Sequence, residues 1–203
     1  MTSSLMLSRL RTLLDESSAG FWTDNECYYA LSDGQREVVN VIFKNNPNSQ
    51  LLKALFMPKS GTDTSSSAIT LPSDFKEFVV ASYTTVTTED QYPCKIVVYD
   101  DFFLREKNNT YLAPSRANPV VYVKPDTTIG RKIYFEPTSS HADYSIVYLT
   151  EPTEISSSIN PLLPAEAQEA IIIYAFSFLL RKDLRATEAD GAYKLFLDMV
   201  GKL

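Results

Sequence analysis

Few residues in this sequence could catalyse a reaction. His141 is the only histidine, and the hydroxyl and carboxyl groups nearest to it belong to Ser139, Ser140 and Asp143. A Ser-His-Asp triad also requires an oxyanion hole and a turn that exposes the nucleophile, and no motif in the sequence supplies them. We therefore interpret His141 as a solvent-exposed residue in a turn between two strands. Hydrolysis through His141 is the third of three functional hypotheses.

Metal and phosphate sites are not predicted either. Cys27 and Cys94 are the only cysteines, and with one histidine they cannot form the Cys and His ligand set of a structural zinc site. No Asp-x-Asp-x-Asn-Gly loop offers oxygen ligands to calcium. The segment 59–65, KSGTDTS, has the residue types of a phosphate-binding loop in the wrong order, and no predicted strand leads into it. The sequence therefore predicts a protein without enzymatic activity, metal or cofactor.

The charge of the chain argues against a nucleic-acid-binding surface. Of its 203 residues, 44% are apolar and 22% charged, and the net charge is −6. This composition is ordinary for one or two globular domains, and it lacks the basic surface that duplex binding requires. The densest basic cluster is Arg181, Lys182 and Arg185. It falls at the end of a predicted helix, where cations complement the helix dipole, and phosphate binding is the alternative.

Neither a signal peptide nor a membrane span is predicted. The N-terminus, MTSSLMLSRLRTLLDESS, has an amphipathic helix pattern interrupted by arginines. The longest apolar run, 171–180, is too short to span a bilayer, which needs about 20 residues. With two cysteines that form no framework of pairs, the sequence indicates a reducing cytoplasm.

Two helices are predicted at the N-terminus, over 4–17 and 24–44, and the turn at 18–20 makes them an αα-hairpin. Thr23 and Glu26 have the spacing of a capping box at the start of the second helix. One stripe of that helix recurs at steps of three and four residues: Tyr28, Leu31, Gln35, Val38 and Ile42. Such a stripe is suited to packing and not to chemistry.

The middle of the chain is predicted to be β-rich. The polar stretch 58–67, PKSGTDTSSS, is expected to be a disordered loop, because its small residues bury too little surface to offset their ordering entropy. Strands are then expected at 77–83, 94–99, 119–124, 131–136 and 144–149. Short turns separate the last three, which predicts an antiparallel meander and not a parallel βαβ sheet. A short helix is expected within 100–109.

The C-terminal part is predicted to be helical again. A helix that starts at Pro164 and runs to Lys182 is apolar on nearly all sides and must therefore be surrounded. Thr187 and Asp190 repeat the capping pattern and open a last helix that runs to Leu203.

This order of elements predicts an α+β fold with two domains. The N-terminal helical hairpin and the C-terminal helix pair, residues 1–52 and 160–203, would form one helical bundle. Residues 53–159 would form an inserted antiparallel β meander or sandwich.

Several segments resemble the head-tail adaptor proteins of tailed bacteriophages. These proteins commonly read Arg-x-x-Leu-x-Asp and then Phe/Trp-Thr/Ser-Asp before a helix that ends in Gln-Arg. The segment that resembles this opening is 9–39, RLRTLLDESSAGFWTDNECYYALSDGQREVV, with Arg9 as the leading Arg. The resemblance continues at 71–78, LPSDFKEF, and at 133–155, IYFEPTSSHADYSIVYLTEPTEI. It ends at 162–182, LLPAEAQEAIIIYAFSFLLRK, where the family has a Leu-Pro segment before a helix with Tyr and Ala.

The resemblance implies a structural virion protein. Such adaptors form a ring, usually of twelve copies, that docks beneath the portal and connects the phage head to the tail. The implied partners are further copies of the chain, the portal, and a tail, nozzle or second adaptor protein, while DNA passes through the channel without sequence-specific binding. The implied location is the neck of the virion, and the host cytoplasm during assembly, with no membrane involved. A non-phage oligomeric binding or assembly module is the second hypothesis.

The resemblance also assigns portal docking to the C-terminal segment. We expect Phe196, Met199, Val200 and Leu203 to be the anchors, and the alternative is that this stripe packs on its own subunit. Residues expected in the subunit core or in contacts between copies are Trp22, Leu31, Val38, Ile42, Ile172, Phe176 and Tyr193.

Overall fold

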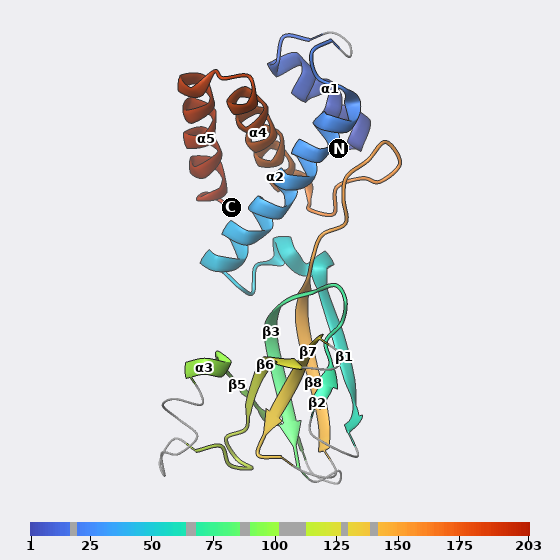
Figure 1. The fold of residues 1–203 in the computed structure, drawn as a ribbon, viewed down its shortest axis with the longest axis vertical. Coiled ribbons are helices and arrows are strands. Elements are labelled where there is room, and N and C mark those ends of the chain that lie inside the picture. Colours follow the sequence, from blue (N-terminus) through green and yellow to red (C-terminus); the bar gives the residue numbers. More distant parts are fainter. Residues whose placement is uncertain (17–19, 64–67, 86–89, 102–112, 127–129, 139–141) are drawn as a thin grey trace. The chain divides into compact units, whose positions relative to one another are not determined.

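The computed structural model describes the chain except for residues 17–19, 64–67, 86–89, 102–112, 127–129 and 139–141 (Figure 1). The chain divides into a helical unit, residues 1–55 with 151–203, and a β unit, residues 56–150. The predicted α+β class is confirmed, with helical ends on either side of a β region. The sequence placed the boundaries at 52/53 and 159/160, whereas the structure assigns 151–159 to the helical unit.

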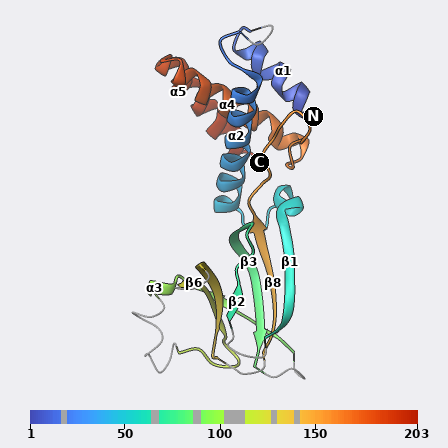
Figure 2. The same ribbon diagram turned by 45° about the vertical axis from the view of Figure 1, so that its right-hand side comes forward.

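The helical unit is built around helix α4. Its elements are α1 (Ser3–Leu13), α2 (Asp24–Asn45), the 3₁₀ helix η1 (Gln50–Leu55), α4 (Ala165–Lys182) and α5 (Ala186–Val200). Helix α4 contacts α1, α2 and α5 (Figures 1 and 2). It is buried along most of its length, as the prediction of a surrounded helix requires. The α1 and α2 pair and the α4 and α5 pair are the two predicted hairpins.

The start of α2 confirms the predicted capping box. The Glu26 amide donates to Thr23 Oγ1 over 3.3 Å, and the Thr23 amide donates to Glu26 Oε2 over 2.9 Å. Two N–H groups that the first turn would leave without partners are thereby satisfied. The hydrogen bonds to Thr23 lower the pKa of the Glu26 carboxyl. The predicted stripe of α2, from Tyr28 to Ile42, is buried.

The predicted cap of the last helix is wrong. Helix α5 begins at Ala186, its N-cap is Arg185, and no side chain caps it. The reason lies in how α4 ends. The Leu184 amide donates to the Arg181 carbonyl and the Arg185 amide to the Leu180 carbonyl, so the chain turns directly into α5 before Thr187 is reached. Pro164 is the N-cap of α4 and not its first residue.

The described residues of the β unit form two four-stranded sheets. Its strands are β1 (Phe56–Asp63), β2 (Ala68–Thr70), β3 (Phe75–Thr84), β4 (Tyr92–Pro93), β5 (Lys95–Ile96), β6 (Val120–Asp126), β7 (Gly130–Glu136) and β8 (Ala142–Thr150). The sheet orders are β1-β8-β3-β4 and β2-β7-β6-β5. A core with residues from β3, β6, β7 and β8 lies between the sheets, including stacked Tyr83 and Phe135 rings. The unit is therefore a sandwich.

Two predictions for this unit are wrong. Residues 58–63 belong to β1 and are not a loop, because each pairs with a residue of β8, from Pro58 with Val147 to Asp63 with Ala142; residues 64–67 lie outside the described part. The last three strands do not form one meander, because β6 and β7 pair with each other while β8 enters the other sheet. Within the predicted strand 94–99 only Lys95–Ile96 form a strand, β5, and Tyr99 already begins α3 (Tyr99–Asp101). His141 and its turn lie outside the described residues.

Candidate assembly site

The helical unit holds the returning chain against α2. We call residues 151–164 the strap. The Gln35 side chain, which is 1% exposed, donates from Nε2 to the Thr153 carbonyl over 2.9 Å and accepts the Leu162 amide at Oε1 over 2.8 Å. The Ser32 hydroxyl accepts the Ile155 amide over 2.9 Å. These bonds satisfy backbone groups of the strap that are buried at Ile155 and partly buried at Thr153 and Leu162, so they hold 151–159 against the helices.

Arg36 adds a charged contact to the same strap. Its guanidinium lies 2.9 Å from Asp33, 2.9 Å from Glu154 and 3.4 Å from Glu151. The hydrogen bond to Glu154 is the main reason why the pKa of Arg36 is raised. All four side chains are partly exposed, so these ion pairs contribute little to the free energy of folding. They instead help to fix the position of the strap. The Gln-Arg pair of the sequence motif therefore has a positioning role.

The residue before this pair sets the distance between two helices. A Cβ atom placed on Gly34 would lie 2.7 Å from the Ile171 carbonyl oxygen of α4. Only glycine permits this approach of α2 to α4. The segment Gly34-Gln35-Arg36 thus fixes both the packing of α2 on α4 and the course of the strap.

A buried arginine organises the connection between α1 and α2. The Arg11 guanidinium donates to Glu16, to the Trp22 carbonyl over 3.1 Å and to Asp24. Burial opposes its charge, but the hydrogen bond to Asp24 and the nearby carboxylates outweigh this effect and raise the pKa of Arg11. Glu16 in turn accepts the Phe21 amide over 2.9 Å. Sequence reasoning missed this arginine, because an Arg on an amphipathic helix usually faces water.

The residues predicted for the core or for contacts between copies divide into two sets. Five of them are buried inside the helical unit: Trp22, Leu31, Val38, Ile42 and Ile172. Phe176 and Tyr193 are half-buried. The Tyr193 ring lies 5.6 Å from that of Phe196 and 6.3 Å from that of Tyr174. Only Phe176 and Tyr193 leave surface for another molecule.

The predicted portal anchors must be revised. Phe196 is 0% exposed and Val200 is 3% exposed, and the Phe196 ring packs edge-on against Tyr174 of α4 at 5.2 Å. Both therefore belong to the core of their own subunit, as the alternative interpretation held for this stripe. Met199 is half-buried and Leu203 is exposed. The sequence pattern identified the apolar side of α5. It did not show whether that side packs on its own subunit or on another protein.

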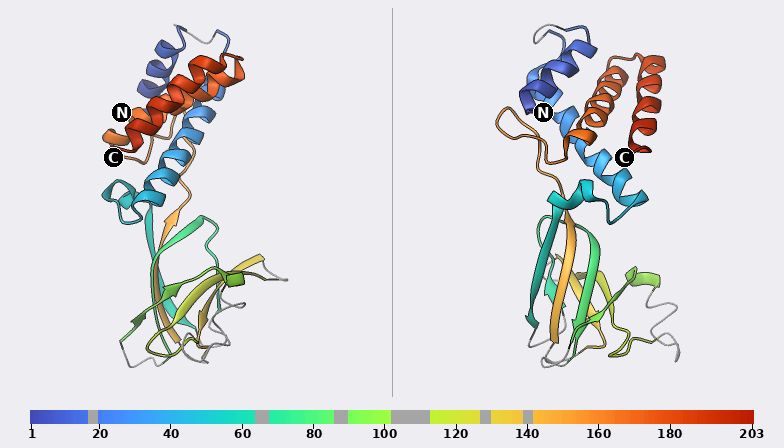
Figure 3. Two further views of the ribbon diagram at one scale, coloured as in Figure 1. Left: turned by 90° about the vertical axis from the view of Figure 1, so that its left-hand side faces the viewer. Right: turned by 180° about the vertical axis from the view of Figure 1, so that it is seen from behind.

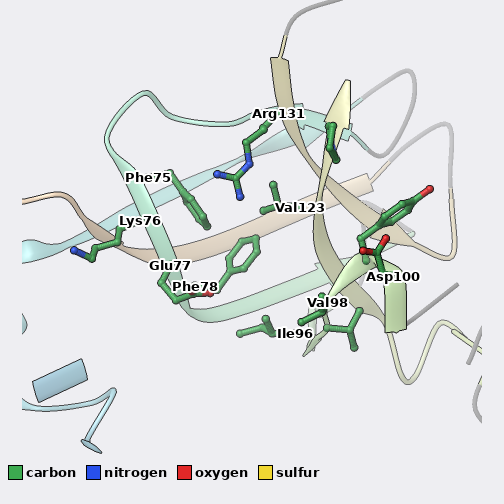
Figure 4. Close-up of a pocket in the computed structure, with 12 residues that line it drawn as sticks. Phe75, Lys76, Glu77, Phe78, Ile96, Val98, Asp100, Val123 and Arg131 are labelled. Atoms are coloured by element: carbon green, nitrogen blue, oxygen red, sulfur yellow. The ribbon is translucent and has the colours of Figure 1, made fainter. Parts of the chain in front are cut away.

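A cleft of about 470 Å³ lies in the described part of the β unit. Its apolar lining includes Phe75, Phe78 and Val123, and Arg131 lies beside Phe75 (Figure 4). Glu77 and Asp100 contribute carboxylates. No serine, cysteine or histidine is among its described lining residues.

The described residues carry little reactive chemistry elsewhere. Burial raises the pKa of the Cys27 thiol to about 11 and that of Cys94 to about 12, and a protonated thiol is a poor nucleophile. Within the described ranges no group of histidine, cysteine and acidic residues could hold a metal ion. None of the described helices is long and apolar enough to cross a membrane.

Comparison with known proteins identifies the family. No curated protein matches the chain. The sequence model of the SU10 adaptor protein family matches residues 1–203, the whole length of the chain. This family comprises structural adaptors of bacteriophages, in agreement with the resemblance noted from the sequence. The chain therefore belongs to the SU10 adaptor protein family and is a structural adaptor component of a phage virion.

Proposed function

We propose that the protein is one subunit of a ring, with twelve copies, that docks beneath the portal and connects the phage head to the tail. The observation that carries this proposal is the family match over the entire chain. The ring would sit at the neck of the virion, after assembly in the host cytoplasm. Its tail-side partner would be a tail, nozzle or second adaptor protein. It would act without catalysis or a cofactor.

The ring would enclose the channel through which DNA passes. A wall that let DNA slide would need few phosphate contacts, because each fixed cation adds salt-dependent affinity for the duplex. The net charge of −6 supports such a wall.

The portal would be contacted by the exposed flank of α5. Leu195 is 49% exposed, Met199 follows one helical turn later, and Leu203, 40% exposed, ends the chain described here. We keep Met199 and Leu203 as anchors, add Leu195, and remove the buried Phe196 and Val200. Leu195 and Met199 share one face because they are four residues apart.

Electron microscopy of the purified protein mixed with its portal tests the ring. A closed ring on the portal supports the proposal, and a monomer that leaves the portal bare contradicts it. The docking residues are tested by replacing Leu195 and Met199 together with serine. The variant should keep its helical content and thermal midpoint and lose portal binding, whereas Leu162→Ser, an exposed change on the strap, should leave binding intact. Unchanged portal binding by the double variant would refute the assignment.

A further inference from the structure

The turn between α4 and α5 contains a leucine in an unfavourable backbone conformation. Leu184 has φ of 60°, in the left-handed region. It follows the C-cap of α4. The amides of Leu184 and Arg185 donate hydrogen bonds back to carbonyl groups of α4, and these two bonds form a Schellman motif. This position usually holds glycine, because a Cβ atom there crowds the backbone. Leucine is thus a costly choice for the turn.

The subunit itself does not use the Leu184 side chain. Leu184 is 91% exposed, so almost none of its apolar surface is buried by the helices on either side. Glycine would close the same turn without the steric cost, and no packing would be lost. The side chain is therefore suited to a contact outside the subunit.

A second exposed apolar side chain lies in the connection between α1 and α2. Phe21 is 70% exposed and comes next after Leu184 among the exposed large apolar residues of the described chain. Its amide is held by Glu16, and its ring packs edge-on against Trp22 at 5.0 Å. Phe21 is thus exposed and held in place, so little ordering entropy would be lost on binding.

The two turns carry opposite charges at the same end of the helical unit. Residues 181–185 contain three cations, Arg181, Lys182 and Arg185, and one acid, while residues 21–26 contain Asp24 and Glu26 and no base. Much of both charges is satisfied within one copy. Asp190 and Glu188 pair with Arg181 and Arg185, and Arg11 pairs with Asp24. Glu26 accepts hydrogen bonds from Thr23 and is also attracted by Lys182 of the same copy. Both connections lie at one end of this unit in every view (Figures 1 and 3).

We propose that the Leu184 turn of one copy packs on the Phe21 turn of the next copy. The inference rests on the proposed ring and names one lateral contact within it. Two different surfaces of the same chain meet, so the contact is heterologous, as a closed ring requires. An apolar pair at the centre with a basic rim on one side and an acidic rim on the other matches the usual arrangement of a protein interface.

Two single variants and their mixture test this contact. Leu184→Gly removes the side chain and relieves the backbone, so the subunit should keep or raise its thermal midpoint while self-association weakens at least about tenfold. Phe21→Ser should weaken self-association equally. An equimolar mixture should form dimers that do not grow, because the Leu184 turn of one variant still fits the Phe21 turn of the other. Sedimentation velocity measures all three, and Leu197→Ser, an exposed change elsewhere on α5, should associate as the unaltered chain does.

The outcomes separate this contact from the ring itself. If the variants form the same rings as the unaltered chain, the contact is wrong and the ring proposal stands. If Phe21→Ser associates normally while Leu184→Gly does not, Leu184 meets another surface and the pairing is wrong. If the unaltered chain stays monomeric at its highest soluble concentration and on the portal, both proposals fail.

Discussion

Gly34 cannot take a side chain without a shift of α2 or α4. The Ile171 carbonyl oxygen would lie 2.7 Å from a Cβ atom at this position, and that oxygen belongs to backbone that cannot rotate away. Alanine normally stabilises a helix relative to glycine by about 0.5–1 kcal/mol. At Gly34 the helices α2 and α4 must instead separate, which is a form of overpacking.

We therefore expect Gly34→Ala to lower the free energy of unfolding by about 1–3 kcal/mol. Gly191→Ala is the matched control, because nothing lies within 4 Å of a Cβ atom placed there. The control should raise the free energy of unfolding by about 0.5–1 kcal/mol. Urea denaturation of both variants measures the difference, and two changes of the same sign would show that the helix contact is not limiting.

The buried thiol of Cys27 makes the free energy of unfolding depend on pH in the alkaline range. Its pKa in the folded protein is about 11, above the ordinary value of 9.0, because burial disfavours the thiolate. The folded state therefore binds this proton more tightly than the unfolded state. The corresponding stability is complete below pH 9.0 and is lost as the pH rises through about 11.

Replacing Cys27 with alanine should remove that dependence. Between pH 9.0 and about 11 the free energy of unfolding of the variant should fall less than that of the unaltered chain. Other groups that titrate in this range contribute equally to both proteins, so the difference isolates the thiol. Identical slopes in the two proteins would contradict the raised pKa.

At the scale of elements, helices were easier to predict than strands. The start of α2 was predicted correctly, because Thr23 and Glu26 form a cap through local bonds that four residues determine. The start of α5 was missed, because the bonds from Leu184 and Arg185 back into α4 close the turn without any side chain. Burial of Phe196 and Val200 depends on α4, so the stripe alone did not reveal it.

The strand β1 was missed for a different reason. Residues 58–63 have the small and polar composition of a loop, yet β8 offers each of them a backbone partner distant in sequence. Strand formation depends on such partners more than on intrinsic preference. The Gln35 bonds to the strap are equally distant in sequence, so the sequence alone did not indicate that 151–159 packs with the helices.

The pairing of β1 predicts that the chain resists proteolysis at Lys59. This residue pairs with Ile146, and its ammonium donates to the Thr70 carbonyl over 3.2 Å. A protease needs an extended segment that is free to leave its neighbours. Trypsin should therefore leave the bond after Lys59 intact in the native protein and cut it in urea-unfolded protein. Rapid native cleavage at Lys59, identified by mass spectrometry, would restore the loop interpretation.

At the scale of the whole molecule, the chain begins in the helical unit, then forms the β unit, and finally returns to the helical unit. Residues 1–55 and 151–203 share the helical unit, and 56–150 form the sandwich. This order of elements was visible in the change from helical to alternating periodicity, because the two periods reflect different side-chain directions. After the β unit the chain re-enters the helical unit through the strap. Gln35 and Arg36 of α2 hold the strap there.

The charge of the whole molecule predicts weak binding to duplex DNA. The proposed ring would have to let the genome pass without holding it, and the net charge of −6 disfavours an extended basic surface that would release counterions from the duplex. Arg181 and Arg185, the strongest candidates for phosphate contacts, are paired with Asp190 and Glu188. We expect a dissociation constant no tighter than about 1 µM at physiological salt, and little change in it between unrelated sequences. Fluorescence anisotropy with labelled duplexes at two salt concentrations measures both quantities.

A tighter affinity that falls steeply with salt would mean that these arginines exchange their carboxylate partners for phosphates. In that case Arg181→Gln and Arg185→Gln would each flatten the salt dependence by about one phosphate contact, and the wall of the ring would have to be sought elsewhere on the chain.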